Sequence, residues 1–262
     1  MTAEERPYSH SGKAVEFLDP FSRPRVAIVL VAVTLLLTVL FYLVPAIDIA
    51  VSSLFFRQEP CAPEVAKTIC GTFPALSDTT LNDIRDFFHQ MPIVIAVLLL
   101  LTAVSISLRR DKSLQRLATG IYVALAALIV NSLFIVNLWL KSYSGRPRPE
   151  QTDLFGGSLP FVRAGEFTDF CASNCSFISG ESSAAFWLVG VAALFPPQWR
   201  ARALGAALVM ATLAGGLRVA FGGHYFSDAV IAAVASVATF AVLATLAKAF
   251  GLGGTETTST SR

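Results

Sequence analysis

A histidine and an aspartate stand four residues apart in the stretch GLRVAFGGHYFSD, shortly after an arginine. His224 lies in a glycine-rich turn, Arg218 precedes it, and Asp228 follows at the spacing of one helical turn. If a helix begins near His224, the Asp228 carboxylate lies on the same face and can bind one imidazole nitrogen, which fixes the tautomer and raises the basicity of the other nitrogen. An isolated histidine is more often structural, but this combination favours a nucleophile or a general base.

Basic residues are concentrated in a second stretch, KSYSGRPRPEQ, in which Lys141 is followed by Arg146 and Arg148. Pro147 and Pro149 fix φ and remove backbone donors, so the two guanidinium groups lie on a stiffened loop. A planar guanidinium matches the oxygens of a phosphate group. The alternative is that these basic residues cap a helix and extend toward lipid headgroups. Spacing alone does not decide whether Arg146 contacts a substrate or only its own loop.

The third stretch, CSFISGESSAAF, begins an apolar run with small and polar residues. Ser179 and Gly180 stand where unpaired backbone N–H groups and the positive end of a helix dipole favour an anion. Gly180 allows close approach of the backbone, and the Ser179 hydroxyl adds a donor, although Ser-Gly before a helix is also a common cap. Glu181 then places a carboxylate at the head of the run, and its presence there needs an explanation.

Composition places these residues in a membrane protein. Of the 262 residues, 54% are hydrophobic and only 15% are charged, which is too apolar for an ordinary soluble domain. The net charge of +2 is too small to suggest a nucleic-acid partner, and membrane topology accounts for the basic excess. The apolar runs are continuous and do not alternate with polar residues, so they predict helices and not strands.

Six apolar runs are long enough to cross about 30 Å of hydrocarbon. The sequence therefore predicts an all-α, polytopic membrane protein, a bundle of six transmembrane helices that forms one domain over residues 1–250. The polar segment 1–24 is expected to remain as a cytoplasmic tail, not as a cleaved signal peptide, and 251–262 to form a disordered tail. The expected spans are Arg25–Ile47, Pro92–Leu108, Leu117–Leu140, Ile178–Phe195, Ala203–Phe221 and Phe226–Phe250.

Basic residues in short loops orient the bundle. Three basic clusters fall on the same side of six spans, and that side is expected to be the cytoplasm. The outward-facing segments are then 48–91, 141–177 and the turn 222–224, so the three polar stretches all lie at outward span ends. Basic residues are otherwise sparse on that side, which favours phosphate binding over simple capping. The cytoplasmic clusters comprise Arg23, Arg25, Arg109, Arg110, Lys112, Arg116, Arg200 and Arg202.

The four cysteines lie only in the outward-facing segments. Cys61 and Cys70 share the first of these segments, and Cys171 and Cys175 share the second. Two local disulfides in an oxidising compartment agree with this distribution. A four-cysteine metal site is the alternative, because Cys171 and Cys175 have a ligand-like spacing, but no histidine accompanies them.

A short interfacial helix is expected in the first outward segment, over Thr80–Met91. Its apolar residues recur at helical spacing, and Ser77–Thr80 offer N-cap residues. A helix along the outer membrane–water boundary and a lid packed on the bundle both agree with this periodicity. The apolar positions are Leu81, Ile84, Phe87, Phe88 and Met91.

Taken together, the three polar stretches resemble the type 2 phosphatidic acid phosphatase family, which is related to the vanadium haloperoxidases. The family pattern is K-x6-RP, then PSGH, then SR-x5-H-x3-D. KSYSGRPRP matches the first motif in full, and the third motif matches with Leu217 in place of serine. In the second motif Ser179 and Gly180 match, whereas Ile178 replaces proline and Glu181 replaces histidine. The order, the spacing and the expected six-span topology agree with the membrane-bound members of the family.

The resemblance implies that His224 attacks phosphorus and forms a phosphohistidine, with Asp228 orienting the imidazole. It also implies a reaction that needs no metal and no cofactor, and the sequence shows no obvious carboxylate cage for a metal. The groups expected to hold the phosphoryl oxygens, and to stabilise the charge that develops on them, are Lys141, Arg148, Ser179, the Gly180 N–H and Arg218.

Glu181 replaces the histidine that, in the family, protonates the leaving oxygen. Burial and a neighbouring phosphate dianion raise the pKa of such a carboxyl, whereas a helix dipole and arginines lower it. Three interpretations follow: a catalytic glutamic acid that serves as the proton donor, a leaving group that needs little help, such as a pyrophosphate, or an impaired enzyme. The first is preferred, and an intact nucleophile pair makes the third the least favoured.

The expected function is hydrolysis of a phosphomonoester or pyrophosphate on a membrane lipid, at the periplasmic face of a bacterial-type inner membrane. The resemblance suggests lipid A phosphates, undecaprenyl pyrophosphate, phosphatidylglycerol phosphate and phosphatidic acid as substrates. The position of the motifs at span ends, level with the headgroups of the bilayer, favours a lipid over a soluble phosphate. Transfer of the phosphoryl group to a second lipid, instead of water, is a close alternative.

A non-catalytic lipid-phosphate binder or transporter would use the same residues. Transport pathways usually place ionisable groups near the middle of spans, whereas Asn131 and neighbouring hydroxyl residues are nearly all the mid-span polar groups here. An asparagine at such a position more often makes a helix–helix hydrogen bond. We therefore favour an enzyme, and the sequence makes no prediction of its oligomeric state.

Overall fold

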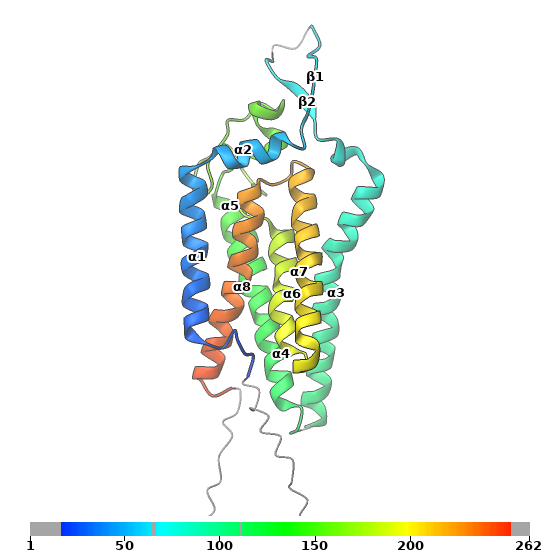
Figure 1. Ribbon diagram of the computed structural model, residues 1–262, viewed down its shortest axis with the longest axis vertical. Helices are drawn as coiled ribbons and strands as arrows, with labels where there is room; N and C mark the ends of the chain where they lie inside the picture. The colour runs from blue at the N-terminus through cyan, green and yellow to red at the C-terminus, as the bar shows by residue number, and fades with distance from the viewer. Residues whose placement is uncertain (1–16, 64–66, 111, 253–262) are drawn as a thin grey trace, which may run out of the picture.

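The computed structural model describes residues 17–63, 67–110 and 112–252, which form an elongated helical bundle (Figure 1). Within these residues, five helices are long and apolar enough to cross a membrane. The prediction of a polytopic all-α membrane protein is therefore confirmed. The five are α1 (Pro24–Leu43), α3 (Thr79–Arg109), the continuous run Gln115–Tyr143, α7 (Pro197–Ala220) and α8 (Phe226–Ala249).

The third of these runs consists of three parts with different helical winding. It begins as α4 (Gln115–Leu128), widens into the π-helical turns of η2 (Ile129–Leu140) and ends as α5 (Lys141–Tyr143). The expected third span, Leu117–Leu140, therefore lies inside a longer helical run, and Lys141 continues the helix beyond it.

The fourth expected span, Ile178–Phe195, is shorter than predicted. Its helix consists of α6 (Gly180–Val191) and one further turn, η5 (Ala192–Leu194), so it is roughly 23 Å long. It is surrounded by other helices, and the buried Trp187 donates from Nε1 to the carbonyl oxygen of Ala124 at 2.6 Å. Because α6 is shorter than the hydrocarbon is thick, the count of six spans remains a prediction.

The first span ends earlier than expected, because the chain turns sharply after Leu43. Pro45 begins a short helix, α2 (Ala46–Ser53), which lies across the end of the bundle in Figure 1. The expected limit at Ile47 is therefore wrong by a few residues. The turn has a consequence for the interior, because it carries the α2 residue Asp48 into a fully buried position.

The expected interfacial helix over Thr80–Met91 is not a separate element. It forms the first turns of α3, which continues through Pro92 to Arg109, and the Asp78 side chain caps it by accepting from Leu81 N at 3.0 Å. Proline does not end this helix because its fixed φ is helical and only one backbone hydrogen bond is lost. The segment packs on the bundle, since Phe88 contacts a buried cluster of alanines on α6 and α7.

The loop after α2 forms a small antiparallel hairpin of β1 (Arg57–Glu59) and β2 (Cys70–Thr72), in which Arg57 pairs with Thr72 and Glu59 with Cys70. Cys61 and Cys70 form one disulfide, with Cα atoms 5.2 Å apart. Cys171 and Cys175 form the other, with Cα atoms 5.8 Å apart. The two predicted local disulfides are confirmed, and the alternative of a four-cysteine metal site is wrong.

In the middle of the bundle, polar contacts centre on Asn131. Asn131 of η2 donates to the Ser183 hydroxyl of α6, and its side-chain oxygen accepts from Thr239 Oγ1 of α8 at 3.3 Å. This agrees with the interpretation of Asn131 as a helix–helix contact. Close packing elsewhere depends on small residues, as is usual between membrane helices. The buried alanines of α8 are Ala229, Ala232, Ala233, Ala238, Ala241, Ala244 and Ala247.

The basic clusters come together at the end of the bundle opposite the hairpin (Figure 1). Arg200 donates to the carbonyl oxygen of Asp19 at 3.3 Å, and the Arg116 guanidinium lies 6.0 Å from the centre of the Phe17 ring. Phe17 and Leu18 are buried there, so this part of the expected N-terminal tail packs on the helices. The rest of that tail, 1–16, and the end of the expected C-terminal tail, 253–262, lie outside the described residues.

Candidate active site

Backbone hydrogen bonds tie the three polar stretches together at the hairpin end of the bundle. Ser176 N donates to the Arg146 carbonyl at 2.8 Å, which joins the second stretch to the approach to α6. Glu150 N donates to the Gly222 carbonyl at 3.1 Å, which joins it to the histidine turn. Ser179 N donates to the Asp228 carbonyl at 3.2 Å, which joins α6 to α8. Residues from distant parts of the chain therefore meet at one place.

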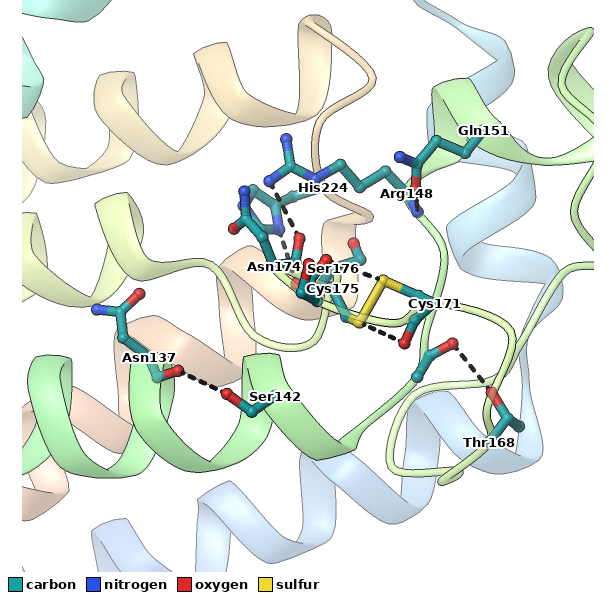
Figure 2. The surroundings of a disulfide bond; sticks show 12 residues. Asn137, Ser142, Arg148, Gln151, Thr168, Cys171, Asn174, Cys175, Ser176 and His224 are labelled. Carbon is teal, nitrogen blue, oxygen red and sulfur yellow. Dashed lines mark hydrogen bonds between the residues drawn. A yellow bond between two sulfur atoms is a disulfide. The ribbon is translucent and has the colours of Figure 1, made fainter.

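His224 is buried, and one of its two nitrogens is held by the backbone. Nδ1 lies 2.8 Å from the carbonyl oxygen of Ser176, a contact visible in Figure 2. Because a carbonyl oxygen can only accept, Nδ1 carries the proton, and Nε2 retains its lone pair. Asp228 Oδ2 lies 3.7 Å from Nδ1, at ion-pair distance. The expected orienting role is therefore divided between Asp228 and the Ser176 carbonyl.

The His224 imidazole is neutral at ordinary pH. Burial, together with the positive charges of Arg218 and Lys141, lowers the pKa of His224 to about 4, although Asp228 opposes this shift. A neutral imidazole with a free Nε2 is the form that can attack an electrophile. Arg218 and Lys141 are therefore within electrostatic range of the ring.

The low pKa of His224 predicts a loss of stability in acid. Between pH 6.5 and about 4 the unfolded chain binds a proton on this histidine and the folded chain does not, so stability rises with pH. Over this pH range the free energy of unfolding changes by about 3 kcal/mol. The parent should therefore lose more Tm than His224→Gln when the pH is lowered from 7 to 4. Equal pH dependence of the two Tm values would contradict the low pKa.

Asp228 accepts hydrogen bonds from several directions and is fully buried. Oδ1 accepts from Arg146 Nη1 at 2.6 Å. Oδ2 accepts from the Ser176 hydroxyl and from Tyr225 N at 2.9 Å. These contacts fix the carboxylate beside the imidazole, because rotation of its side chain would break all of them.

Arg146 is a structural residue within this network. Its side chain is fully buried; Nη2 donates to Asp48 Oδ2 at 2.7 Å, Nε donates to the Val162 carbonyl at 2.9 Å, and the guanidinium lies 4.2 Å from the centre of the Tyr225 ring. Burial alone would lower the pKa of Arg146, but Asp228 and Asp48 offset burial and raise it. Each of its three nitrogens donates within the protein, so Arg146 supports the site without facing a substrate.

Three predicted phosphate-binding groups lie around the histidine turn and the start of α6. A Cβ atom added to Gly180 would lie 3.4 Å from Lys141 Nζ, so the ammonium lies against the N-terminal turn of α6. A Cβ added to Gly223 would lie only 2.7 Å from Arg218 Nη2, so this guanidinium covers the residue before His224. Both side chains therefore end close to the backbone of the proposed site.

Ser179 and Arg148 complete the predicted set. Ser179 is the N-cap of α6, and its hydroxyl oxygen accepts from Ser182 N at 3.3 Å and from Ser182 Oγ at 3.0 Å, which leaves its own proton available for donation. Figure 2 shows the Arg148 side chain extending from its loop toward His224, where Nη2 donates to the Asn174 carbonyl at 3.2 Å. Arg148 is also within electrostatic range of Lys141. The group can bind an anion in front of Nε2.

Glu181 lies between two arginines. Its Oε1 is 2.6 Å from Arg85 Nη2 and 3.4 Å from Arg218 Nε. Ion pairs with two guanidinium groups favour the charged carboxylate, and a carboxylate has no proton to give. The interpretation of Glu181 as the proton donor therefore requires these arginines to separate from it first.

The sequence analysis did not place Asp48, Arg85 or Ser176 in this site. It also left open the structural role of Arg146. Asp48 and Arg85 come from segments 98 and 96 residues away from their partners. A weak signal existed for both, since Asp48 is a carboxylate directly after an apolar run, and Arg85 is the only lysine or arginine in 79–91. Ser176 acts mainly through a backbone carbonyl, which any residue carries.

Comparisons with known proteins agree with the three motifs. The family model described as PAP2 superfamily matches residues 117–251. Proteins named lipid A 4′-phosphatase from Rhizobium etli and Rhizobium leguminosarum are each 36% identical over 197 residues, which covers 74% of this chain and 77% and 84% of theirs. One of that name from Francisella tularensis subsp. novicida is 28% identical over 200 residues, covering 75% and 84%. No solved structure matches.

Proposed function

The chain belongs to the PAP2 superfamily and is a membrane phosphatase that hydrolyses a lipid phosphate, and from this premise we propose that it removes the 4′-phosphate of lipid A. The observation that carries the proposal is the gathering of Lys141, Arg148 and Arg218 near the His224 imidazole at one end of the bundle. The names of the relatives supply the substrate. The remaining groups of the proposed site are Ser179, Gly180, Glu181 and Asp228.

In the first step, we propose that His224 Nε2 attacks the phosphorus atom of the substrate. The N–P bond forms as the bond to the leaving oxygen breaks, and the lipid leaves as an alcohol once that oxygen takes up a proton from water. The imidazole becomes positively charged, and Asp228, at 3.7 Å from Nδ1, stabilises it. The Ser176 carbonyl keeps the ring in the orientation needed for attack.

The basic groups lower the energy of the transferred phosphoryl group. Its three equatorial oxygens carry the charge of the transition state, and positioned guanidinium and ammonium groups stabilise that charge. The Gly180 N–H and the Ser179 hydroxyl add donors at the positive end of α6. In the second step, water attacks the phosphohistidine, the N–P bond breaks, and inorganic phosphate leaves with His224 neutral again.

The position of these residues in the bundle supports a lipid substrate and a periplasmic site. The site lies at the hairpin end, whereas the basic loop residues lie at the other end, which the positive-inside rule assigns to the cytoplasm. Both disulfides are at the hairpin end, as expected for an oxidising compartment. A phosphorylated headgroup in the outer leaflet would lie level with the site.

The test of this function is a phosphate-release assay with a defined lipid panel. Purified protein in detergent is given bis-phosphorylated lipid A, its 1-monophosphoryl and 4′-monophosphoryl forms, phosphatidic acid and undecaprenyl pyrophosphate. We expect phosphate release from the two lipid A forms that carry a 4′-phosphate, with products identified by mass spectrometry, and none from the 1-monophosphoryl form.

Each other outcome excludes part of the proposal. Release from the 1-monophosphoryl form would exclude specificity for the 4′ position, and faster release from another lipid would replace lipid A as the substrate. Consumption of the lipid without free phosphate would indicate transfer to a second lipid. Binding without any consumption would indicate a lipid-phosphate binder.

A further inference from the structure

Arg85 is outside the three motifs, yet its side chain lies against the candidate site. It lies on the second turn of α3, whose first turns lean away from the other helices in Figure 1. From there the guanidinium reaches the first turn of α6. Nη2 lies 2.6 Å from Glu181 Oε1, and Nε lies 3.3 Å from Glu181 Oε2. Two parallel hydrogen bonds to one carboxylate fix the plane of the guanidinium.

Glu181 is shared between Arg85 and Arg218. Its Oε1 lies 3.4 Å from Arg218 Nε, which is buried and makes no hydrogen bond within the described part of the chain. Arg218 in turn covers Gly223, next to the proposed nucleophile. The carboxylate therefore connects an arginine of the phosphate-binding set to an arginine outside it. Asp86 Oδ1 also lies 3.6 Å from Arg85 Nη1, but its side chain is 60% exposed.

The ion pair is accessible to a ligand. The side chains of Arg85 and Glu181 are 29% and 14% exposed, so neither is sealed inside the protein. Apolar packing already holds this part of α3, because Phe88, almost one turn further along, contacts the cluster of Ala185, Ala211 and Ala214. Another role is needed to explain an arginine at this position.

A phosphate group would compete with Glu181 for both guanidinium groups. Phosphate oxygens accept the same paired N–H donors as a carboxylate, and Arg85 remains partly accessible from outside. Arg146 provides the contrast, since its nitrogens are buried and already donate within the protein. Of these two arginines, only Arg85 can exchange its partner for a ligand at little cost.

We propose that Arg85 is a substrate-binding residue that contacts the phosphorylated headgroup of the lipid, and that Glu181 is a positioning residue that holds Arg85 toward the site before the substrate arrives. The inference rests on the proposed function. A headgroup with two phosphates offers two groups of the same chemistry: the phosphoryl group to be removed and the second phosphate. KM for the lipid and the inhibition constant of inorganic phosphate together show which of the two phosphates Arg85 contacts.

The test compares the full-length parent with Arg85→Gln, Arg85→Lys and Arg57→Gln in detergent micelles. Arg57 is an exposed arginine of β1, equal in charge and outside the site, so its variant should behave as the parent does. Arg85→Gln should raise KM for bis-phosphorylated lipid A about tenfold to a hundredfold, as expected for loss of a charge-assisted pair of hydrogen bonds, with kcat nearly unchanged. Arg85→Lys keeps the charge without the planar fork and should recover part of this loss.

The inhibition constant of inorganic phosphate identifies the group that Arg85 contacts. A Ki that rises together with KM assigns Arg85 to the transferred phosphoryl group, and an unchanged Ki with a raised KM assigns it to the rest of the headgroup. An unchanged KM with a lowered Tm would mean that Arg85 only ties α3 to α6, and the proposal would be wrong.

A measurement without turnover separates this inference from the proposed function. Bis-phosphorylated lipid A should raise the Tm of the parent and of Arg57→Gln more than that of Arg85→Gln. If the parent binds the lipid in this way but releases no phosphate, the function fails and the Arg85 contact stands. Equal thermal protection of Arg85→Gln and the parent would overturn the contact itself.

Glu181→Gln tests the positioning role. Glutamine keeps the length and one hydrogen-bonding oxygen but removes the charge that holds Arg85, so KM should rise less than in Arg85→Gln. The double variant should have the KM of Arg85→Gln alone, because both changes act through the same guanidinium. A large fall in kcat at unchanged KM would assign Glu181 to the chemical step and overturn the positioning role.

Discussion

Replacement of His224 by alanine should abolish phosphate release, with kcat lowered on the order of 10⁶-fold, as expected for loss of a catalytic nucleophile. The loss follows from the geometry, because Nε2 of His224 is the nucleophilic atom that the proposed mechanism requires. The measurement is phosphate release from bis-phosphorylated lipid A under conditions of excess substrate. Rapid denaturing quench of the parent with labelled substrate should also trap a labelled phosphohistidine that His224→Ala does not form.

The matched control for this variant is His89→Ala. His89 is an exposed histidine of α3, so its removal should leave most of the activity and the Tm of the parent. Substantial residual activity in His224→Ala, with unchanged product, would assign the attack on phosphorus to water or to another residue. A labelled phosphohistidine that persists in His224→Ala would place the covalent step elsewhere in the chain.

Arg146→Met should be the most destabilising substitution in the outer half of the molecule, at about 3–5 kcal/mol. Methionine fills much of the same volume but leaves Asp48 and Asp228 buried without their counter-charge. Burial already raises the pKa of Asp48 with Arg146 present, so loss of this arginine removes its main compensation. Activity should disappear together with stability, because Asp228 would no longer be fixed beside His224. The measurement is Tm and chemical unfolding of the purified protein.

Arg148→Met is the control, since it changes the same residue type two positions away on the same loop. Arg148 is half-buried and makes one side-chain hydrogen bond that the structure records, to Asn174. Its loss should therefore leave Tm nearly unchanged while KM rises and kcat falls. Equal stability of Arg146→Met and Arg148→Met would mean that the buried network contributes nothing to the fold.

A double variant measures how much of the loss of stability in Arg146→Met comes from the unpaired Asp48 carboxylate. Asp48→Asn combined with Arg146→Met removes one of the two uncompensated carboxylates, so the pair should be more stable than Arg146→Met alone. Coupling of this kind is expected only for residues in direct contact. Strictly additive effects would show that Asp48 and Arg146 act independently.

The buried network joins three distant parts of the chain beside the imidazole. Arg146 of the polar loop binds both Asp48 of α2 and Asp228 of α8, and its carbonyl oxygen accepts a hydrogen bond from Ser176 N. The imidazole of His224 is thereby held by two groups that different parts of the chain position. Such contacts limit the motion of the loop that carries the proposed phosphate-binding residue Arg148.

Sequence alone was sufficient for the features that depend on local chemistry. Continuous apolar runs predict spanning helices because lipid leaves backbone groups no other partner, and α1, α3, α7 and α8 confirm this for most of the expected spans. Cysteines that are close together in one outward segment form local disulfides, because the short stretch of chain between them keeps them near each other. The predicted pairing of His224 with Asp228 is also found, at 3.7 Å, because the turn that holds His224 leads directly into the first turn of α8, where Asp228 lies.

Only the tertiary structure decided which charged residues meet. Arg146 and Arg148 are the same residue type two positions apart, yet the first is buried by Asp48 and Asp228 and the second extends toward His224. Glu181 gained its partner from α3, a helix that periodicity had divided at Pro92. Burial, and therefore the strength of each ion pair, depends on how distant helices pack, and a linear pattern of residue types carries no information about that packing.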